Sequence, residues 1–269
     1  MPDKIETVAK KVIFEAGELI RQRIGRIAGS SVHAKGPADY VTEIDKRCEE
    51  LITEAIRDNF PDHHIMAEES VNDGLQAGYT WVIDPVDGTT NFIHGFPFVA
   101  VSVAVCLDKK PVLGLVLDPV RNELFSAKSG DGAWLNGSRL PRRRKVDLNR
   151  ALIATGFPMR AKEYIDDYLA TFRSIFMRVS GIRRAGSAAL DLAYVAAGRV
   201  DGFWEIGLKA WDIAAGSLLI TEAGGIVSDF RGKDDHLANG NVVAGVPTVY
   251  PFLIEQMQAH LVAALEARR

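Results

Sequence analysis

The pattern of strands and helices changes once along the chain, near residue 145, and no other feature restricts the fold as strongly. Before this point, valines alternate with small residues from Val99 to Cys106. Further strand patterns at 112–117 and 123–127 lead to an Asn136-Gly137 turn, a succession typical of an antiparallel meander. After residue 145, short strand patterns alternate with helix patterns, which indicates a layered α/β arrangement.

Two helix patterns precede the meander. Apolar residues recur at helical spacing from Ile5 to Ile20 and again from Ile44 to Ile56, where Thr42 is placed to begin the second helix. We therefore predict an α+β half over residues 1–147 and an α/β half over residues 148–269. Because no flexible linker separates them, the two halves are expected to form one compact unit.

Composition argues against several classes of protein. The 32 basic and 35 acidic residues leave a formal net charge of −3, whereas a dedicated nucleic-acid binder normally has a basic excess. The two cysteines, Cys48 and Cys106, have apolar neighbours and are expected to be core residues in a reducing compartment. Neither a secretory leader nor an apolar run of membrane-spanning length is present, so a cytoplasmic protein without a membrane partner is expected.

The segment from Asp84 to Thr90 is the most informative about chemistry. A buried strand pattern at residues 81–83 ends in Asp84, and Asp87 follows after a turn that Pro85 stiffens. Two carboxylates on a rigid turn suit Mg²⁺, and the Gly88-Thr89-Thr90 stretch suits a phosphate at the start of a helix. Asp-Gly pairs are also common in ordinary turns, so this segment alone does not decide the function.

Other carboxylates also lie at the ends of predicted elements. Glu68 and Glu69 follow a short strand pattern at 65–67, Asp45 lies at a helix start, and Asp212 begins another helix. Each could be a helix cap or a solvated side chain. Together they favour metal-assisted phosphoryl transfer, because α/β enzymes place their sites at such ends.

Competing chemistries have little support. The chain has no Gly-x-Ser-x-Gly elbow, no Walker-type phosphate loop and no His-Glu-x-x-His motif. The adjacent His63 and His64 are expected to form a solvated turn rather than a zinc site.

Four segments together resemble the inositol monophosphatase family. They are residues 39–45 (DYVTEID), 67–70 (AEES), 81–92 (WVIDPVDGTTNF) and 211–225, which begins WDIAAG and ends EAGG. The stretch 184–194 (RAGSAALDLAY) is similar to the bacterial, SuhB-type branch of that family. The resemblance spans nearly the whole chain and implies a layered α-β-α-β-α sandwich of the inositol monophosphatase and fructose-1,6-bisphosphatase type.

The resemblance also implies a site that holds two to three Mg²⁺ ions. It assigns the first ion to Glu68, Asp84 and the carbonyl of Val86, and the second to Asp84, Asp87 and Asp212. A third, weaker ion would bind near Glu68 through water.

Catalytic and substrate-binding roles are implied in the same way. Thr89, oriented by Asp45, would act with Glu68 on the attacking water. The phosphate would be held by the backbone of Gly88 and Thr89 with Thr90. The hydroxyls of the alcohol would meet Glu205 and the stretch Gly186, Ser187 and Ala188, and Asp87 and Asp212 are also implied to bind substrate. Lys35, in a Gly/Ser/Pro-rich segment predicted to be a loop from Gly25 to Asp39, would lie on a flap.

The implied activity is direct hydrolysis of inositol monophosphate to myo-inositol and phosphate by a metal-activated water. Inhibition by lithium and a homodimer are implied as well. Fructose 1,6-bisphosphate, a nucleotide 3′-phosphate and histidinol phosphate remain alternative substrates. A partnership with RNA polymerase and antitermination factors, as in SuhB-type proteins, is a further alternative. The basic run Arg142–Lys145 could contact such a partner, or it could be a solvated loop.

Overall fold

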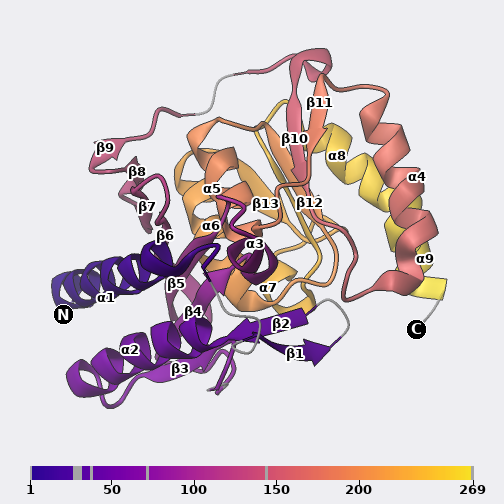
Figure 1. The fold of residues 1–269 in the computed structure, drawn as a ribbon. Helices are drawn as coiled ribbons and strands as arrows, with labels where there is room; N and C mark the ends of the chain where they lie inside the picture. Colours follow the sequence, from indigo (N-terminus) through magenta and orange to yellow (C-terminus); the bar gives the residue numbers. More distant parts are fainter. Residues whose placement is uncertain (1, 27–31, 37–38, 71–72, 143–144, 268–269) are drawn as a thin grey trace.

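The computed structural model describes residues 2–26, 32–36, 39–70, 73–142 and 145–267 (Figure 1). It confirms the layered sandwich: helices, a seven-stranded sheet, helices, a five-stranded sheet and helices follow one another. Within the described ranges, no helix has the length and apolar character needed to cross a membrane.

The seven-stranded sheet has the strand order β3-β4-β5-β6-β7-β8-β9. Its strands are β3 (His64–Ala67), β4 (Tyr79–Asp87), β5 (Ala100–Leu107), β6 (Lys110–Asp118), β7 (Glu123–Lys128), β8 (Gly132–Leu135) and β9 (Ser138–Arg139). β3 and β4 are parallel, and all later neighbours are antiparallel. The predicted meander is therefore confirmed.

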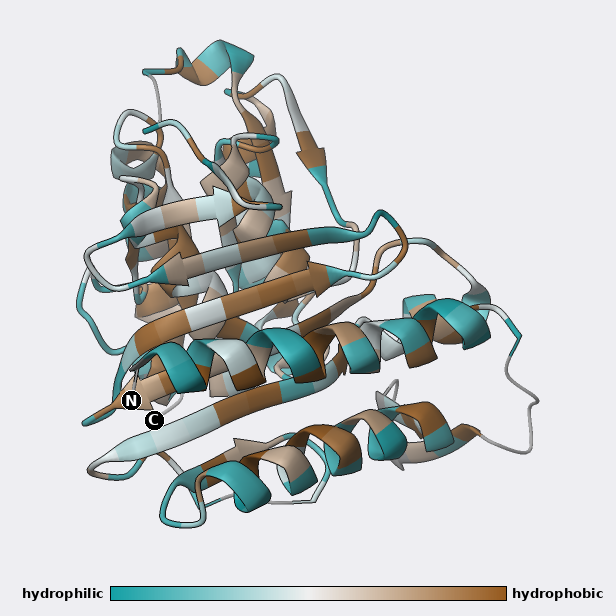
Figure 2. Ribbon diagram, turned by 90° about the vertical axis from the view of Figure 1, so that its left-hand side faces the viewer, coloured by the Kyte–Doolittle hydropathy of each residue, from teal (hydrophilic) through white to brown (hydrophobic). Residues whose placement is uncertain are grey.

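Helices α1 (Pro2–Arg23) and α2 (Glu43–Asn59) cover one face of this sheet. Both cross in front of the strands in Figure 2, and hydrophilic and hydrophobic residues alternate along them. Their apolar stripes, which include Val12 and Ile52, pack on sheet residues such as Val103 and Leu115. As predicted, Thr42 caps α2, because its hydroxyl accepts a 3.1 Å hydrogen bond from the N–H of Ile44.

The five-stranded sheet has the order β11-β10-β12-β14-β13. Its strands are β10 (Leu152–Thr155), β11 (Gly181–Arg183), β12 (Gly202–Glu205), β13 (Ile226–Ser228) and β14 (Val242–Gly245). β10 runs parallel to both β11 and β12, while β14 is antiparallel to β12 and β13.

Helices α5 (Ala188–Ala197) and α6 (Ala210–Glu222) lie between the two sheets. From Ala210 to Ile220 every residue of α6 is buried, which is expected of a helix that contacts other elements on all sides. Helices α4 (Ile165–Phe176) and α8 (Tyr250–Gln256) cover the outer face of the second sheet, and α9 (Ala263–Ala267) is the last element among the described residues. A short helix, α7 (His236–Asn239), precedes β14.

The segment predicted to be a loop from Gly25 to Asp39 contains a strand, so this prediction was wrong in part. β1 (Val32–Gly36) pairs antiparallel with β2 (Asp39–Thr42). The Gly, Ser and Pro content of the segment hides the hairpin, since a two-stranded pairing depends on contacts between strands more than on local composition. Lys35 lies in β1, and its side chain is outside the described part of the chain, so its flap role stays a prediction.

Both cysteines are buried free thiols, as predicted. His63 differs from the expectation of a solvated turn. Its ring stacks on Phe60 and Tyr79, and its Nδ1 accepts a 3.0 Å hydrogen bond from the indole N–H of Trp81. The division of the chain after residue 147 stays a prediction.

Candidate active site

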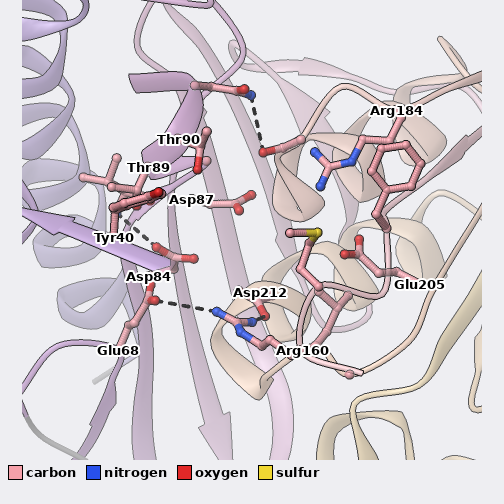
Figure 3. Close-up of a pocket in the computed structure, with 18 of the residues that line it drawn as sticks. Tyr40, Glu68, Asp84, Asp87, Thr89, Thr90, Arg160, Arg184, Glu205 and Asp212 are labelled. Carbon is pink, nitrogen blue, oxygen red and sulfur yellow. Dashed lines mark hydrogen bonds and ion pairs between the residues drawn. The ribbon is translucent and has the colours of Figure 1, made fainter. Parts of the chain in front are cut away.

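A β-bulge brings the first two carboxylates of the site together. Asp84 pairs with Ser102 of β5 and Asp87 pairs with Ala100, so three steps along β4 match two steps along β5. In a regular strand, side chains three residues apart point to opposite faces, and the inserted residue removes that difference. β4 therefore continues to Asp87, where a turn was predicted, and both side chains line one pocket (Figure 3).

The third carboxylate comes from the other half of the chain. Asp212 lies in the first turn of α6, where one of its oxygens accepts a 2.7 Å hydrogen bond from the N–H of Lys209. The carboxylates of Asp84, Asp87 and Asp212 each offer an oxygen within 4.8 Å of the others, and all three residues are buried.

Burial and mutual repulsion shift the titration of this cluster. Burial raises the pKa of Asp84 well above its usual value, and the charges of Glu68, Asp87 and Asp212 raise it further. The pKa of Asp87 rises to about 7, mainly through burial and then through Asp212. Hydrogen bonds from the Ser187 hydroxyl at 2.5 Å and the Ala189 N–H at 2.7 Å oppose that rise.

The cluster fits a hard divalent cation. Three buried carboxylates repel one another unless a positive charge lies among them, and oxygen donors are the ligands that Mg²⁺ prefers. Glu68 adds a fourth carboxylate at the end of β3, where its N–H donates to the carbonyl of Ile83.

Arg160 is a residue of this site that our sequence analysis missed. Its guanidinium lies 3.1 Å from an oxygen of Asp212 and 3.8 Å from an oxygen of Glu68 (Figure 3). Arg160 opposes the rise that burial produces in the pKa of Asp212. An arginine in a loop usually faces solvent, so the sequence around Arg160 does not predict its contacts with Asp212 and Glu68.

Thr89 and Asp45 are in contact, as the family resemblance implied. The hydroxyl of Thr89 lies 3.0 Å from a carboxylate oxygen of Asp45 and 3.1 Å from the carbonyl of Val86. Asp45 is buried, which raises its pKa, while hydrogen bonds from Thr42 lower it. Thr89 lines the pocket, and Asp45 lies behind it.

The start of α3 (Thr89–His94) forms one wall of the pocket. Gly88 precedes it with a φ of 91°, and a Cβ there would lie 3.1 Å from the carbonyl oxygens of both Gly186 and Phe98. Only glycine suits this position. The first N–H groups of a helix lack helical acceptors, so this wall is suited to an anion.

The opposite end of the pocket carries Glu205, at the end of β12. Burial raises its pKa to about 8, against the opposing effect of Arg184. Its carboxyl group lies directly over Gly156, where a Cβ would be only 1.8 Å from the carboxyl carbon. The whole pocket has a volume of about 520 Å³.

Most residues expected at the site line this pocket. They are Glu68, Asp84, Val86, Asp87, Gly88, Thr89, Thr90, Gly186, Glu205 and Asp212. Ser187 and Ala188 line a smaller adjoining cavity of about 120 Å³, together with the buried Asp191. The basic run Arg142–Lys145 falls partly outside the described residues, and Arg142 is exposed.

Comparisons with known proteins identify the family of the chain. The sequence model of the inositol monophosphatase family matches residues 1–266 of this chain. The chain is 49% identical to the Nus factor SuhB of Pseudomonas aeruginosa over 264 residues, which cover 96% of this chain and 97% of that protein. It is 41% identical to an inositol-1-monophosphatase of Mesorhizobium japonicum, with 95% and 97% covered. The crystal structure of the extragenic suppressor protein suhB from Bartonella henselae matches with a TM-score of 0.89 and 40% identity, covering 94% of this chain and 98% of that one.

Proposed function

The chain belongs to the inositol monophosphatase family and is a phosphatase, and we propose that it hydrolyses inositol monophosphate in a reaction that requires Mg²⁺. One observation carries this proposal. A single pocket joins three buried carboxylates, the Gly88–Thr90 wall suited to an anion, and Glu205 at the far end.

The metal-binding roles are those that the family resemblance implies. Glu68, Asp84 and the carbonyl of Val86 would hold one ion, and Asp84, Asp87 and Asp212 would hold another. When bound, Mg²⁺ supplies positive charge that offsets the phosphate and increases the acidity of water. A third ion near Glu68 is part of the same proposal.

The residues around the metal site would position the reactants. The backbone of Gly88 and Thr89, with the hydroxyl of Thr90, would hold the phosphate at the start of α3. Thr89 can pass a proton toward Asp45, since the two are hydrogen-bonded at 3.0 Å. Glu68 would accept a hydrogen bond from the attacking water.

Glu205 supports a polyol as the alcohol part of the substrate. When ionised, a carboxyl group at the end of the pocket accepts hydrogen bonds from hydroxyls, and when protonated it can also donate one. Gly186, with Ser187 and Ala188 in the adjoining cavity, would complete this end. Fructose 1,6-bisphosphate, a nucleotide 3′-phosphate and histidinol phosphate are the alternatives against which inositol monophosphate must be compared.

The test is phosphate release from D-myo-inositol 1-phosphate and from the three alternatives, with and without Mg²⁺. We expect Mg²⁺-dependent release, inhibition by Li⁺ and loss of activity in Asp87→Asn. Asp212→Asn should weaken inhibition by Li⁺ if that ion competes for the second metal position. No release from inositol 1-phosphate by the folded protein, with release from another ester, would replace the proposed substrate.

A second function is favoured by the similarity to proteins named Nus factor SuhB. We propose that this chain also contacts RNA polymerase or antitermination factors. Binding of purified RNA polymerase and Nus factors to wild type and to Asp87→Asn tests the idea. Equal binding by wild type and Asp87→Asn would separate this role from catalysis. If wild type binds neither RNA polymerase nor the Nus factors, this second function is ruled out.

A homodimer and a cytoplasmic location complete the proposal. The free, buried thiols of Cys48 and Cys106 suit a reducing compartment. Light scattering after size-exclusion chromatography tests the dimer, and cell fractionation tests the location.

A further inference from the structure

We propose that Arg160 competes with a metal ion for the carboxylates of Glu68 and Asp212. The metal-free protein would hold the guanidinium between these two groups, and binding of Mg²⁺ would displace it. This inference rests on the proposed magnesium site and adds a residue that lowers the affinity of this site for Mg²⁺.

The contacts of Arg160 place its charge where the site needs one. One guanidinium nitrogen lies 3.1 Å from Asp212, another lies 3.8 Å from Glu68, and both partners line the pocket. Figure 3 shows the guanidinium between the two carboxylates. Arginine suits this position because its planar group carries several donors and can bridge two acceptors.

The Asp212 carboxylate is held in place, whereas the Arg160 side chain borders open space. The Asp212 side chain is only 6% exposed and accepts a backbone hydrogen bond from Lys209. The Arg160 side chain is 38% exposed and borders the cavity of about 520 Å³. The guanidinium can therefore move toward solvent while the Asp212 carboxylate stays in place.

Competition follows because the two cations use the same acceptors. The Asp212 oxygen that accepts from Arg160 also accepts from the N–H of Lys209, so Arg160 must leave before this oxygen can ligate a metal. Arg160 thus stabilises the metal-free protein and lowers the apparent affinity for Mg²⁺, since a ligand that binds only one of two states must shift the equilibrium between them.

Isothermal titration with MgCl₂ tests this directly on the full-length protein. We expect R160Q to bind Mg²⁺ about three- to tenfold more tightly than wild type, the range for two partly exposed ion pairs. In EDTA, the Tm of R160Q should be lower than that of wild type, and saturating Mg²⁺ should remove the difference. Lys162→Gln is the matched control, because it removes the same charge from an exposed position two residues away.

The outcomes separate this inference from the proposed function. Unchanged or weaker Mg²⁺ binding by R160Q overturns the competition while leaving the phosphatase proposal intact. If neither wild type nor R160Q binds Mg²⁺, both proposals fail. If R160Q does not fold, R160K provides the test. A single ammonium group bridges two carboxylates poorly, so R160K should bind Mg²⁺ more tightly than wild type. Equal affinity of R160K and wild type for Mg²⁺ would overturn the proposal.

Discussion

The hydroxyl of Thr89 lies 3.0 Å from the carboxylate of Asp45, although 44 residues separate them in the chain. Asp45 also accepts hydrogen bonds from the N–H and the hydroxyl of Thr42, so one carboxylate joins the cap of α2 to the start of α3. The position of Thr89 in the pocket therefore depends on the N-terminus of α2.

Replacement of Asp45 by Asn should reduce kcat about 100-fold while KM and Mg²⁺ affinity change little. The amide keeps only one acceptor oxygen and is a far weaker proton acceptor than the carboxylate, and general-base contributions of this size are usual. Steady-state phosphate release and titration with Mg²⁺ measure the three quantities.

Thr42→Val serves as the control for this variant. It weakens the cap of α2 and leaves the Asp45–Thr89 contact possible, so it should lower the Tm with a much smaller effect on kcat. Equal losses of kcat in both variants would mean that Asp45 acts only through the fold.

Removing a carboxylate from the cluster should stabilise the protein in the absence of metal. In Asp84→Asn, one oxygen can still accept the 3.0 Å hydrogen bond from the N–H of Val86, and the amide can donate to a neighbouring carboxylate. We expect the free energy of unfolding in EDTA to rise by about 1–3 kcal/mol as repulsion is relieved, with loss of activity.

Asp118→Asn is the matched comparison for Asp84→Asn. Asp118 is also fully buried, but it pairs with Arg121 at 2.8 Å, so its replacement should destabilise the protein with or without metal. Chemical denaturation in EDTA and in Mg²⁺ distinguishes the two. If Asp84→Asn is less stable than wild type in EDTA, the carboxylates of the cluster do not repel one another appreciably in the metal-free protein.

The stability of the metal-free protein should fall as the pH rises from about 5 to 8. The pKa of Asp87 is about 7 in the folded protein and lower in the unfolded chain, so the folded state binds the proton more tightly. The resulting stabilisation is complete below the unfolded pKa and is lost as the pH passes the folded value, by about 2–3 kcal/mol for Asp87 alone. Thermal denaturation in EDTA at pH 5.5 and pH 8 measures this change.

Saturating Mg²⁺ should cancel this pH dependence at the upper end of the range. A bound cation favours the ionised carboxylates, so the increase in Tm on adding Mg²⁺ should be larger at pH 8 than at pH 5.5. A metal-free protein that is more stable at pH 8 would contradict the raised pKa of the cluster.

Several features of the site were predictable from the sequence because they depend on local pattern. Asp84 ends a run of buried strand residues, and Asp212 begins a helix with apolar residues on every side. A helix cap or a turn could explain either one alone, but several carboxylates at the ends of predicted elements together indicate a site. The N-cap role of Thr42 is equally local, and the structure confirms it.

The features that were missed depend on pairing between distant segments. The bulge between Asp84 and Asp87 exists only in relation to β5, so the same residues were predicted to be a turn. The β1 strand likewise needs β2 as its partner. Arg160 acquires its role because Glu68 and Asp212, from both halves of the chain, lie beside it.

Gly156 should control how the enzyme binds the alcohol part of its substrate, through its contact with Glu205. A Cβ at this position would lie 1.8 Å from the Glu205 carboxyl carbon, so Gly156→Ala must displace that carboxyl group. We expect KM for inositol 1-phosphate to rise by up to about tenfold, the upper end of the range for one lost hydrogen bond, while kcat/KM for p-nitrophenyl phosphate changes little.

A double-mutant cycle with Glu205→Gln tests this route. If Gly156→Ala acts through Glu205, the effects on KM will not add, because the two residues are in contact. Gly181→Ala in β11 is the control, since its Cβ would meet nothing closer than 3.4 Å and should leave KM unchanged. Additive effects would show that Gly156 influences the pocket through some other group, and an unchanged KM in Glu205→Gln would remove Glu205 as the residue that selects a polyol.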